Sequence, residues 1–390
     1  MFLIDYPYVS DFLKDTLKKN HYPIVATKQA KELLKDDSLN WVSEKETVNL
    51  FKENTNKYIY SNSENVISWV EKNLSFTNLP KHIKIFKNKL KLRELLEDVY
   101  PTYFFKGVKT KDLKKVDSAT LKYPLIVKPV IGFFSLGVHK VNNESEWAPI
   151  VEKINSELKE IEKFYPPEVL NTNNFIIEEC IEGEEFAIDC YYNAQGEAVI
   201  VNIMKHQFAS ENDFSDRLYS TSKDIVLNNL ELFQNLVDTI GEKTALKNFP
   251  IHMEVRVTNE GVAIPIEINP MRFGGWCTTG DVAWFAHKIN VYEYFMEQQK
   301  PNWEEVFKND KNTTYSLILL DNTTGHETSE IASFNYEKLA EDFENPLEIR
   351  QINPDKFPVF GFLITATSAD NKKELTNILN SNLSEYITLK

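Results

Sequence analysis

Cysteine is scarce in this 390-residue chain, which has three, Cys180, Cys190 and Cys277, and no Cys-x-x-Cys pair. An odd, widely spaced set excludes a disulfide-stapled scaffold and a cysteine-rich zinc site, and it fits a reducing compartment. Glycine is also scarce, with 12 residues. Each glycine therefore calls for a conformational reason, such as a tight turn or a close backbone approach.

Basic residues are outnumbered, with 44 Lys and Arg against 58 Asp and Glu, a formal net charge of −14. This balance argues against a nucleic-acid partner, because phosphate backbones attract basic faces. A nucleotide site needs only a few local cations and stays open. No apolar run approaches the roughly 20 residues of a membrane span, and the first residues lack the features of a signal peptide. We expect a cytoplasmic globular protein without a membrane partner.

The length predicts two or three compact units. Residues 1–84 have the short apolar runs and helical spacing of a small α/β unit. A helix is expected over 87–98. The rest of 85–300 has mainly the pattern of strands, with a long helix expected around 226–240. Residues 301–390 are expected to form a small α+β unit. The strands expected in the middle unit cover 123–129, 175–181, 185–192, 198–204, 251–257 and 262–268.

The most informative segment is the predicted hairpin over 251–270. If Glu260 and Gly261 form a two-residue turn, Glu254 lies opposite Glu267, and His252 lies opposite Asn269. Facing carboxylates repel unless a cation lies between them, and carboxylate and amide oxygens are ligands that Mg²⁺ prefers. The pattern equally fits the solvated face of an ordinary hairpin, with Arg256 neutralising the acids. The other face is expected to be wholly apolar: Met253, Val255, Val257, Ile264, Ile266 and Ile268.

A second segment combines a lysine with a glycine-rich turn. Lys128 lies within an apolar strand, where it needs a counter-charge. Gly132 and Gly137 bracket Ser135, and such a turn can present backbone N–H groups to phosphate oxygens. The alternative is a plain hairpin turn beside a lysine that extends to solvent.

A third segment, residues 176–189, places several acids between apolar residues. Glu178 could offer its carboxylate to an adenine edge, and Glu185 could accept hydrogen bonds from ribose hydroxyls. Taken alone, the segment fits a solvated hairpin rim better.

In this order, the three segments resemble the ATP-grasp superfamily, of the carboxylate–amine ligase type, over about residues 85–290. The resemblance implies an α/β (α+β) fold of three parts. They are an N-terminal Rossmann-like pre-ATP-grasp domain (1–84), a two-lobed ATP-grasp domain (85–300) and a small α+β C-terminal subdomain (301–390).

The resemblance also implies roles for individual residues. Two Mg²⁺ ions, or Mn²⁺ in their place, would be bound by Glu254, Glu267 and Asn269. Lys87 and Lys91 are alternatives to Lys89 as the lysine that makes the first phosphate contact. The ATP-binding residues would be Lys89 and Lys128 at the phosphates, Gly132, Ser135 and Gly137 in the loop over them, Glu178, Cys180 and Ile181 at adenine, and Glu185 at the ribose.

Two further residues would act on the reacting groups. Arg272 resembles the arginine that many members direct at the acyl phosphate or at a substrate carboxylate, a task suited to a planar guanidinium. Met271 departs from the commoner Asn-Pro-Arg order. Lys205 matches a γ-phosphate lysine. The roles of His206, Arg217 and His252 stay open.

The activity that the resemblance implies is ATP-dependent ligation of a carboxylate to an amine, with amino acids or small peptides as substrates. An acyl phosphate forms, and the amine displaces phosphate. The alternatives are an ATP-grasp kinase, an acid–thiol ligase and a non-catalytic ATP-binding module. A homodimer is the default expectation.

Overall fold

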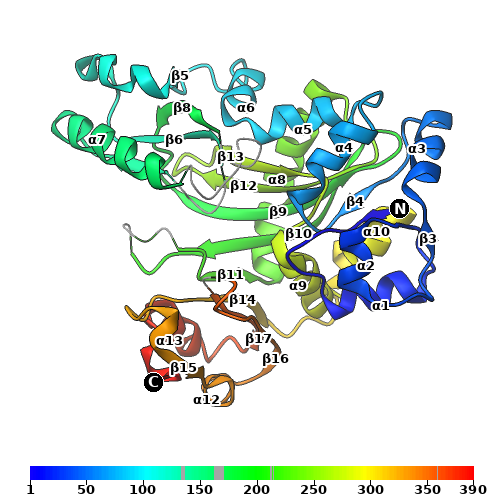
Figure 1. The fold of residues 1–390 in the computed structure, drawn as a ribbon. Helices are drawn as coiled ribbons and strands as arrows, with labels where there is room; N and C mark the ends of the chain where they lie inside the picture. The colour runs from blue at the N-terminus through cyan, green and yellow to red at the C-terminus, as the bar shows by residue number, and fades with distance from the viewer. Residues whose placement is uncertain (133–136, 162–170, 211–212, 214, 358) are drawn as a thin grey trace.

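The computed structural model describes residues 1–132, 137–161, 171–210, 213, 215–357 and 359–390. It confirms the predicted α/β fold, with a parallel N-terminal sheet, a small antiparallel sheet and a large antiparallel sheet. In Figure 1 the N-terminal unit (blue) lies at the right, the small sheet at the upper left and the C-terminal residues (orange to red) at the bottom.

The N-terminal unit is a four-stranded sheet of order β3-β2-β1-β4 whose neighbouring strands run parallel. Helices connect the strands, as in a Rossmann-like unit. Ser10, Thr27 and Ser43 cap α1, α2 and α3 by accepting a backbone N–H of the first turn. The elements are β1 (Phe2–Leu3), α1 (Asp11–Lys19), β2 (Ile24–Val25), α2 (Lys28–Leu34), β3 (Trp41–Val42), α3 (Glu44–Glu53), β4 (Tyr60–Ser61) and α4 (Ile67–Asn73).

Two helices lead from this unit to the small sheet: α5 (Leu79–Lys87) and α6 (Lys89–Leu95). The helix expected over 87–98 is therefore shorter, because Asn88 caps α6 by accepting the N–H of Lys91. Leu92 faces the core, as predicted.

The small sheet has the order β5-β8-β6-β7. Its apolar side chains, among them Leu125, Val127 and Ile177, pack with α7 (Glu144–Ile161) on one face. Because strand side chains alternate, Lys128 and Glu178 project from the other face. The strands are β5 (Phe105–Lys109), β6 (Leu125–Ile131), β7 (His139–Val141) and β8 (Asn171–Glu179).

The large sheet has eight antiparallel strands in the order β13-β12-β9-β10-β11-β14-β17-β16. The helix α8 (Lys223–Thr244) packs on one face through Phe233, which contacts Phe186. The strands are β9 (Glu184–Tyr192), β10 (Ala198–Gln207), β11 (Leu218–Thr221), β12 (Phe249–Val257), β13 (Ala263–Pro270), β14 (Thr314–Asp321), β16 (Pro346–Gln351) and β17 (Val359–Thr367).

The C-terminal residues do not stand apart from this sheet, since three of their strands, β14, β16 and β17, extend it. The domain boundaries at 84/85 and 300/301 stay predictions. The remaining α-helices and strands are α9 (Thr278–His287), α10 (Val291–Glu297), α11 (Trp303–Val306), β15 (Ile331–Phe334), α12 (Tyr336–Glu341), α13 (Lys373–Asn380) and β18 (Ile387–Leu389).

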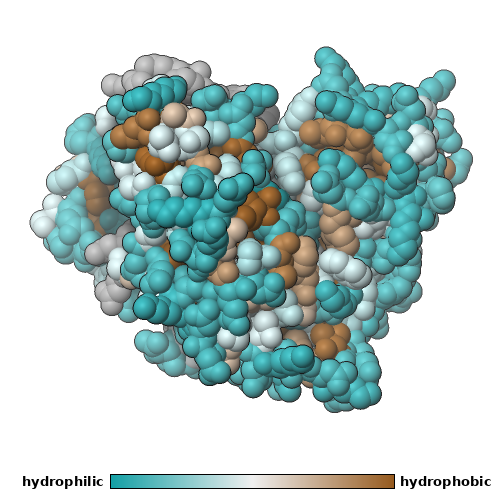
Figure 2. All heavy atoms as spheres, turned by 90° about the horizontal axis from the view of Figure 1, so that it is seen from below, coloured by the Kyte–Doolittle hydropathy of each residue, from teal (hydrophilic) through white to brown (hydrophobic). Residues whose placement is uncertain are grey.

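On the face in Figure 2, apolar patches are small and are separated by polar residues. Among the described helices, none is long and apolar enough to cross a membrane.

Candidate functional site

The β12–β13 hairpin brings the predicted metal ligands together. Glu254 lies opposite Glu267, and His252 lies opposite Asn269, as the sequence predicts. The predicted two-residue turn is wrong, however. Thr258 donates its N–H to the carbonyl of Val262, which leaves a three-residue turn with Gly261 at φ +78°.

A β-bulge explains why the register at the carboxylates is nevertheless right. Val255 lies opposite Pro265, so one extra residue stands in β13 between the turn and Glu267. The bulge also corrects the predicted apolar face. Met253, Val255 and Ile268 are buried in the core, but Ile264 lies opposite Arg256 on the face of the acids.

The pKa values of the two facing carboxylates are shifted in opposite directions. Burial, together with the negative charges of Glu267, Asp216 and Glu185, raises the pKa of Glu254 well above its ordinary value. Burial would also raise the pKa of Glu267, but the charge of Lys89 outweighs it and lowers that pKa to about 2. The raised pKa of Glu254 indicates that too little positive charge lies near the two carboxylates, and a divalent cation would supply it. Within the described ranges, no three His, Cys, Asp or Glu side chains form a metal cluster; the available oxygen set is two carboxylates and the Asn269 amide.

Of the three lysines in competition, Lys89 reaches this site. The residue is 7% exposed, and its Nζ lies 3.0 Å from Oε2 of Glu267 and 3.4 Å from the carbonyl oxygen of Gly132. Lys87 pairs with Glu64 at 2.6 Å instead, and Lys91 is exposed. Lys89 therefore lies between the predicted metal ligand Glu267 and the start of the predicted phosphate loop.

Lys128 has the counter-charge that its burial requires. Its Nζ lies 2.6 Å from Oε1 of Glu178, and the Nε of Arg93 lies 2.6 Å from Oε2. Burial alone would raise the pKa of Glu178, but the charges of Arg93 and Lys128 lower it to about 2. The Glu178 carboxylate is thus directed at two cations, and not free for the adenine contact that the sequence predicts.

The loop and hinge residues are only partly described. Gly137 has φ +72°, which favours glycine, and Ser135 lies outside the described residues. Cys180 and Ile181 lie in the link between β8 of the small sheet and β9 of the large sheet. Gly183 in this link has φ +139°, and a Cβ there would lie 2.0 Å from the carbonyl oxygen of Val257. Glycine is therefore required where the chain crosses between the sheets.

Glu185 lies on the large-sheet side of the site, near the start of β9. It is buried, and its two oxygens lie 2.8 Å from Nδ1 of His206 and 2.8 Å from Nε of Arg256. Burial opposes its charge, but the hydrogen bond with His206 and the charge of Arg256 lower its pKa. The ring of His206 stacks on Tyr219, with 4.0 Å between centroids. His206 is therefore the partner of Glu185 on this face.

Lys205 lies on the other face of the sheet. Directly opposed residues share a face and successive residues alternate. Lys205 lies opposite Phe186, which packs on α8, whereas Glu185 and Glu254 project from the opposite side. The Lys205 ammonium pairs with Glu184. The pleat of β10 thus turns Lys205 away from the acids, which argues against a catalytic role for this lysine.

Arg272 follows a residue in a left-handed conformation, Met271 at φ +64°. Its Nη1 donates to the carbonyl of Phe273 at 2.8 Å, and its Nε lies 3.9 Å from Oε1 of Glu64 in the N-terminal unit. The inserted Met271 is buried, and its carbonyl accepts the N–H of Ser61. The extra residue therefore anchors the segment that carries the arginine.

Asp189, which the sequence analysis missed, holds the glycine-rich segment after Arg272. It is 1% exposed and accepts the N–H of Gly274 at 3.1 Å, the hydroxyl of Thr279 and a hydrogen bond with Nδ1 of His252 at 2.7 Å. His252 is thus tied into this network. The alternation of β9 could have revealed Asp189, since it shares a face with Glu185.

Arg217 has a structural role. Its guanidinium donates to Asp321 at 2.9 Å, to Thr323 at 2.9 Å and to the carbonyl of Ser381 at 3.1 Å. It anchors the C-terminal residues beside β11 through these contacts.

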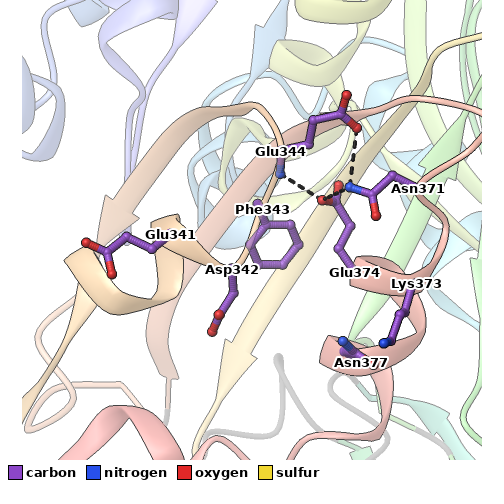
Figure 3. Close-up of a pocket in the computed structure, with 8 residues that line it drawn as sticks. All are labelled: Glu341, Asp342, Phe343, Glu344, Asn371, Lys373, Glu374 and Asn377. Carbon is purple, nitrogen blue, oxygen red and sulfur yellow. Dashed lines mark hydrogen bonds between the residues drawn. The ribbon is translucent and has the colours of Figure 1, made fainter.

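A shallow pocket lies elsewhere, between the end of α12 and α13 (Figure 3). Its Glu374 accepts the N–H of Glu344 at 2.7 Å and a hydrogen bond from the Asn371 amide at 3.0 Å. These polar groups satisfy one another, and no predicted site residue lines the pocket.

The sequence profile of a family described as the ATP-grasp domain matches residues 121–280. Residues 121–280 form an ATP-grasp domain. The match spans the link between β8 and β9 and the β12–β13 hairpin, and it confirms the resemblance predicted from the sequence.

Solved structures extend the likeness to the ATP-grasp fold over the whole chain. An L-amino acid ligase from Bacillus licheniformis is 17% identical, with a TM-score of 0.67, and the match covers 100% of this chain and 98% of that one. A phosphoribosylglycinamide synthetase from Anaerococcus prevotii is 15% identical, with a TM-score of 0.59 and the same coverage. At such identities the likeness shows the fold alone. A search of curated protein sequences finds no significant match.

Proposed function

We propose that this protein is an ATP-dependent ligase that joins a carboxylate to an amine, with amino acids or small peptides as substrates. The observation that carries the proposal is the facing pair Glu254 and Glu267 with Asn269 beside it, and Lys89 at 3.0 Å. The ATP-grasp domain match and the fold likeness to an L-amino acid ligase support it.

In this proposal the described residues divide into a metal set and a nucleotide set. Glu254, Glu267 and Asn269 hold two Mg²⁺ ions, which Mn²⁺ could replace. When bound, the ions neutralise charge on the phosphates of ATP. Lys89 and Lys128 bind the phosphates, with Gly132, Ser135 and Gly137 in the loop above. The Cys180–Ile181 link meets adenine, and Glu185 meets the ribose.

In this proposal two residues have roles other than those first expected. Glu178 positions Lys128, because its carboxylate pairs with that ammonium. Lys205 has no part, since it projects from the other face of the sheet. Arg272 keeps its proposed role as the guanidinium for the acyl phosphate or the substrate carboxylate.

The proposed reaction has two steps. An oxygen of the substrate carboxylate bonds to the γ-phosphorus of ATP, and the bond from that phosphorus to the bridging oxygen of ADP breaks. The amine nitrogen then bonds to the acyl carbon, phosphate leaves and the nitrogen loses a proton. Positioning and charge neutralisation meet these demands, so no side chain has to act as a covalent nucleophile.

Glu267→Gln tests the metal assignment. It keeps the shape of the side chain and removes the charge beside Lys89, so Mg²⁺-dependent ADP formation should fall by about a hundredfold or more. Glu260→Gln, in the exposed turn of the same hairpin, is the matched control and should keep its activity. Full turnover in Glu267→Gln would remove Glu267 from the metal site.

The products separate the proposal from its alternatives. A ligase that acts on an amine releases free phosphate and an amide, a thiol ligase releases phosphate and a thioester, and a kinase releases a phosphorylated substrate. A binding module takes up Mg-ATP and forms no ADP with any substrate pair. A cytoplasmic location and a homodimer stay predictions from the sequence.

A further inference from the structure

A buried arginine that the sequence analysis did not single out connects the two sheets of the candidate site. Arg93 lies in α6 and is 3% exposed. Its Nε donates to Oε2 of Glu178 in β8, and the other oxygen of that carboxylate pairs with Lys128 in β6. On this side, Arg93 therefore reaches the phosphate lysine of the small sheet through a single carboxylate.

The other arm of the same guanidinium reaches the large sheet. Nη1 of Arg93 donates to the carbonyl of Pro265 in β13. Pro265 is the residue at the bulge, opposite Val255, after which Glu267 comes to lie opposite Glu254. Arg93 thus holds the backbone at the point that sets the register of the predicted metal ligands.

We propose that Arg93 is a positioning residue that fixes Lys128 in the small sheet relative to Glu254 and Glu267 in the large sheet. This inference rests on the proposed function, because it assigns these groups to one ATP and metal site. Arg93 need not touch the nucleotide: it acts through Glu178 and through the carbonyl of Pro265.

The chemistry of the side chain favours this role. A guanidinium presents donors in a rigid fork and can bond two acceptors at once, whereas a lysine ammonium at the same place would be drawn to one of them. The ring of Tyr103 lies 4.8 Å from the Arg93 guanidinium carbon and limits its movement.

The remaining donor argues against a role in stability alone. Nη2 of Arg93 is buried and has no hydrogen-bond partner among the described residues. A buried donor without a partner destabilises a fold, and well-packed apolar residues often replace buried ion pairs without loss. An arginine in this environment therefore fits a positioning role better than a role in stability alone.

The test uses the full-length protein and readouts other than turnover. Binding of Mg-ATP is measured by calorimetry, and binding of Mn²⁺ by electron paramagnetic resonance, for the wild type and for Arg93→Lys. Arg350→Lys is the matched control, since Arg350 is equally buried and pairs with Asp281 at 2.6 Å, outside the proposed site. Thermal unfolding reports the stability of each variant.

Arg93→Lys should weaken Mg-ATP binding roughly tenfold and should also weaken Mn²⁺ binding, because one hydrogen bond to each sheet cannot be kept. Arg350→Lys should lower the melting temperature and leave both affinities unchanged. If Arg93→Lys does not fold, Tyr103→Leu is used instead. This variant keeps Arg93 and removes the aromatic ring that packs against it, and Mg-ATP affinity should fall about two- to threefold.

Two results would overturn the inference, and they can be told apart. Wild-type affinities in a folded Arg93→Lys protein, or in Tyr103→Leu when only that variant folds, would remove the positioning role and leave the proposed function intact. Failure of the wild type itself to bind Mg-ATP would overturn the proposed function and the inference with it.

Discussion

At the scale of single residues, each proposed phosphate lysine is held by an acid. Lys89 pairs with Glu267, and Lys128 pairs with Glu178. Buried ammonium groups need such partners, and the pairing also fixes where their charge lies. The formal net charge of −14 is therefore compatible with a phosphate site, because a few positioned cations serve it.

Lys128→Met tests this pairing directly. The change removes the cation and leaves Glu178 with Arg93 as its remaining ion-pair partner, so Mg-ATP affinity measured by calorimetry should fall at least tenfold. The control is Lys106→Met, which alters an exposed lysine of β5 in the same sheet. Equal affinity in the two variants would show that Lys128 does not contact the phosphates.

Single residues also show the limit of reading roles from a motif. Glu178 occupies the expected place in the motif, yet its carboxylate bonds two cations. Arg93 belongs to none of the motifs read from the sequence. Spacing alone could only have placed it one turn after Lys89 on the same helix face. The bonds of both residues depend on how the two sheets meet, which local spacing does not encode.

At the scale of elements, alternation predicted the β12–β13 hairpin well because it depends only on the period of the strand. The pairing of Glu254 with Glu267 followed, although the turn was wrong and a bulge compensated for it. Alternation counted along β10 would also have placed Lys205 away from the acids, had β9 and β10 been aligned. Strand periods were thus predictable, but bulges and cross-strand alignments were not.

The glycine-rich segment after Arg272 yields a prediction with a matched control. A Cβ at position 274 would lie 2.1 Å from Oγ1 of Thr279, whereas at position 275 the nearest atom is Nη1 of Arg272 at 3.9 Å. Gly274→Ala should displace the segment, destabilise the protein by about 1–3 kcal/mol and reduce ADP formation. Gly275→Ala should leave stability nearly unchanged.

Denaturant unfolding and an ADP assay on both variants check this. Similar behaviour of Gly274→Ala and Gly275→Ala would contradict the close packing between Gly274 and Thr279.

At the scale of the whole molecule, the sheets and helices follow the α/β pattern expected from the sequence, and the fold likeness covers 100% of the chain. The C-terminal residues were expected as a small unit, yet β14, β16 and β17 lengthen the large sheet. Strand partners across such distances depend on tertiary packing, which the period of a single strand cannot predict.

The structure predicts a pH dependence of global stability through His287. Burial, between the rings of Trp303 and Phe307, lowers its pKa to about 3. An unfolded histidine titrates near 6.5, so below that pH the unfolded chain binds one more proton than the folded chain. The free energy of unfolding should therefore fall by about 1.4 kcal/mol per pH unit from about 6.5 down toward 3.

Denaturant unfolding of wild type and His287→Gln between pH 4.5 and 7.5 measures this effect. The variant should lose the histidine contribution to the slope, and His326→Gln, which alters a more exposed histidine, should retain it. Identical slopes in wild type and His287→Gln would contradict the buried neutral state.

The central feature of the proposed function is that ATP cleavage requires both a carboxylate and an amine. The direct measurement is a screen of amino acid pairs with Mg-ATP that records ADP, free phosphate and product mass. A carboxylate–amine ligase should release phosphate only when both substrates are present, with a product whose mass is their sum less one water. A phosphorylated product without free phosphate, or Mg-ATP binding without ADP from any pair, would contradict it.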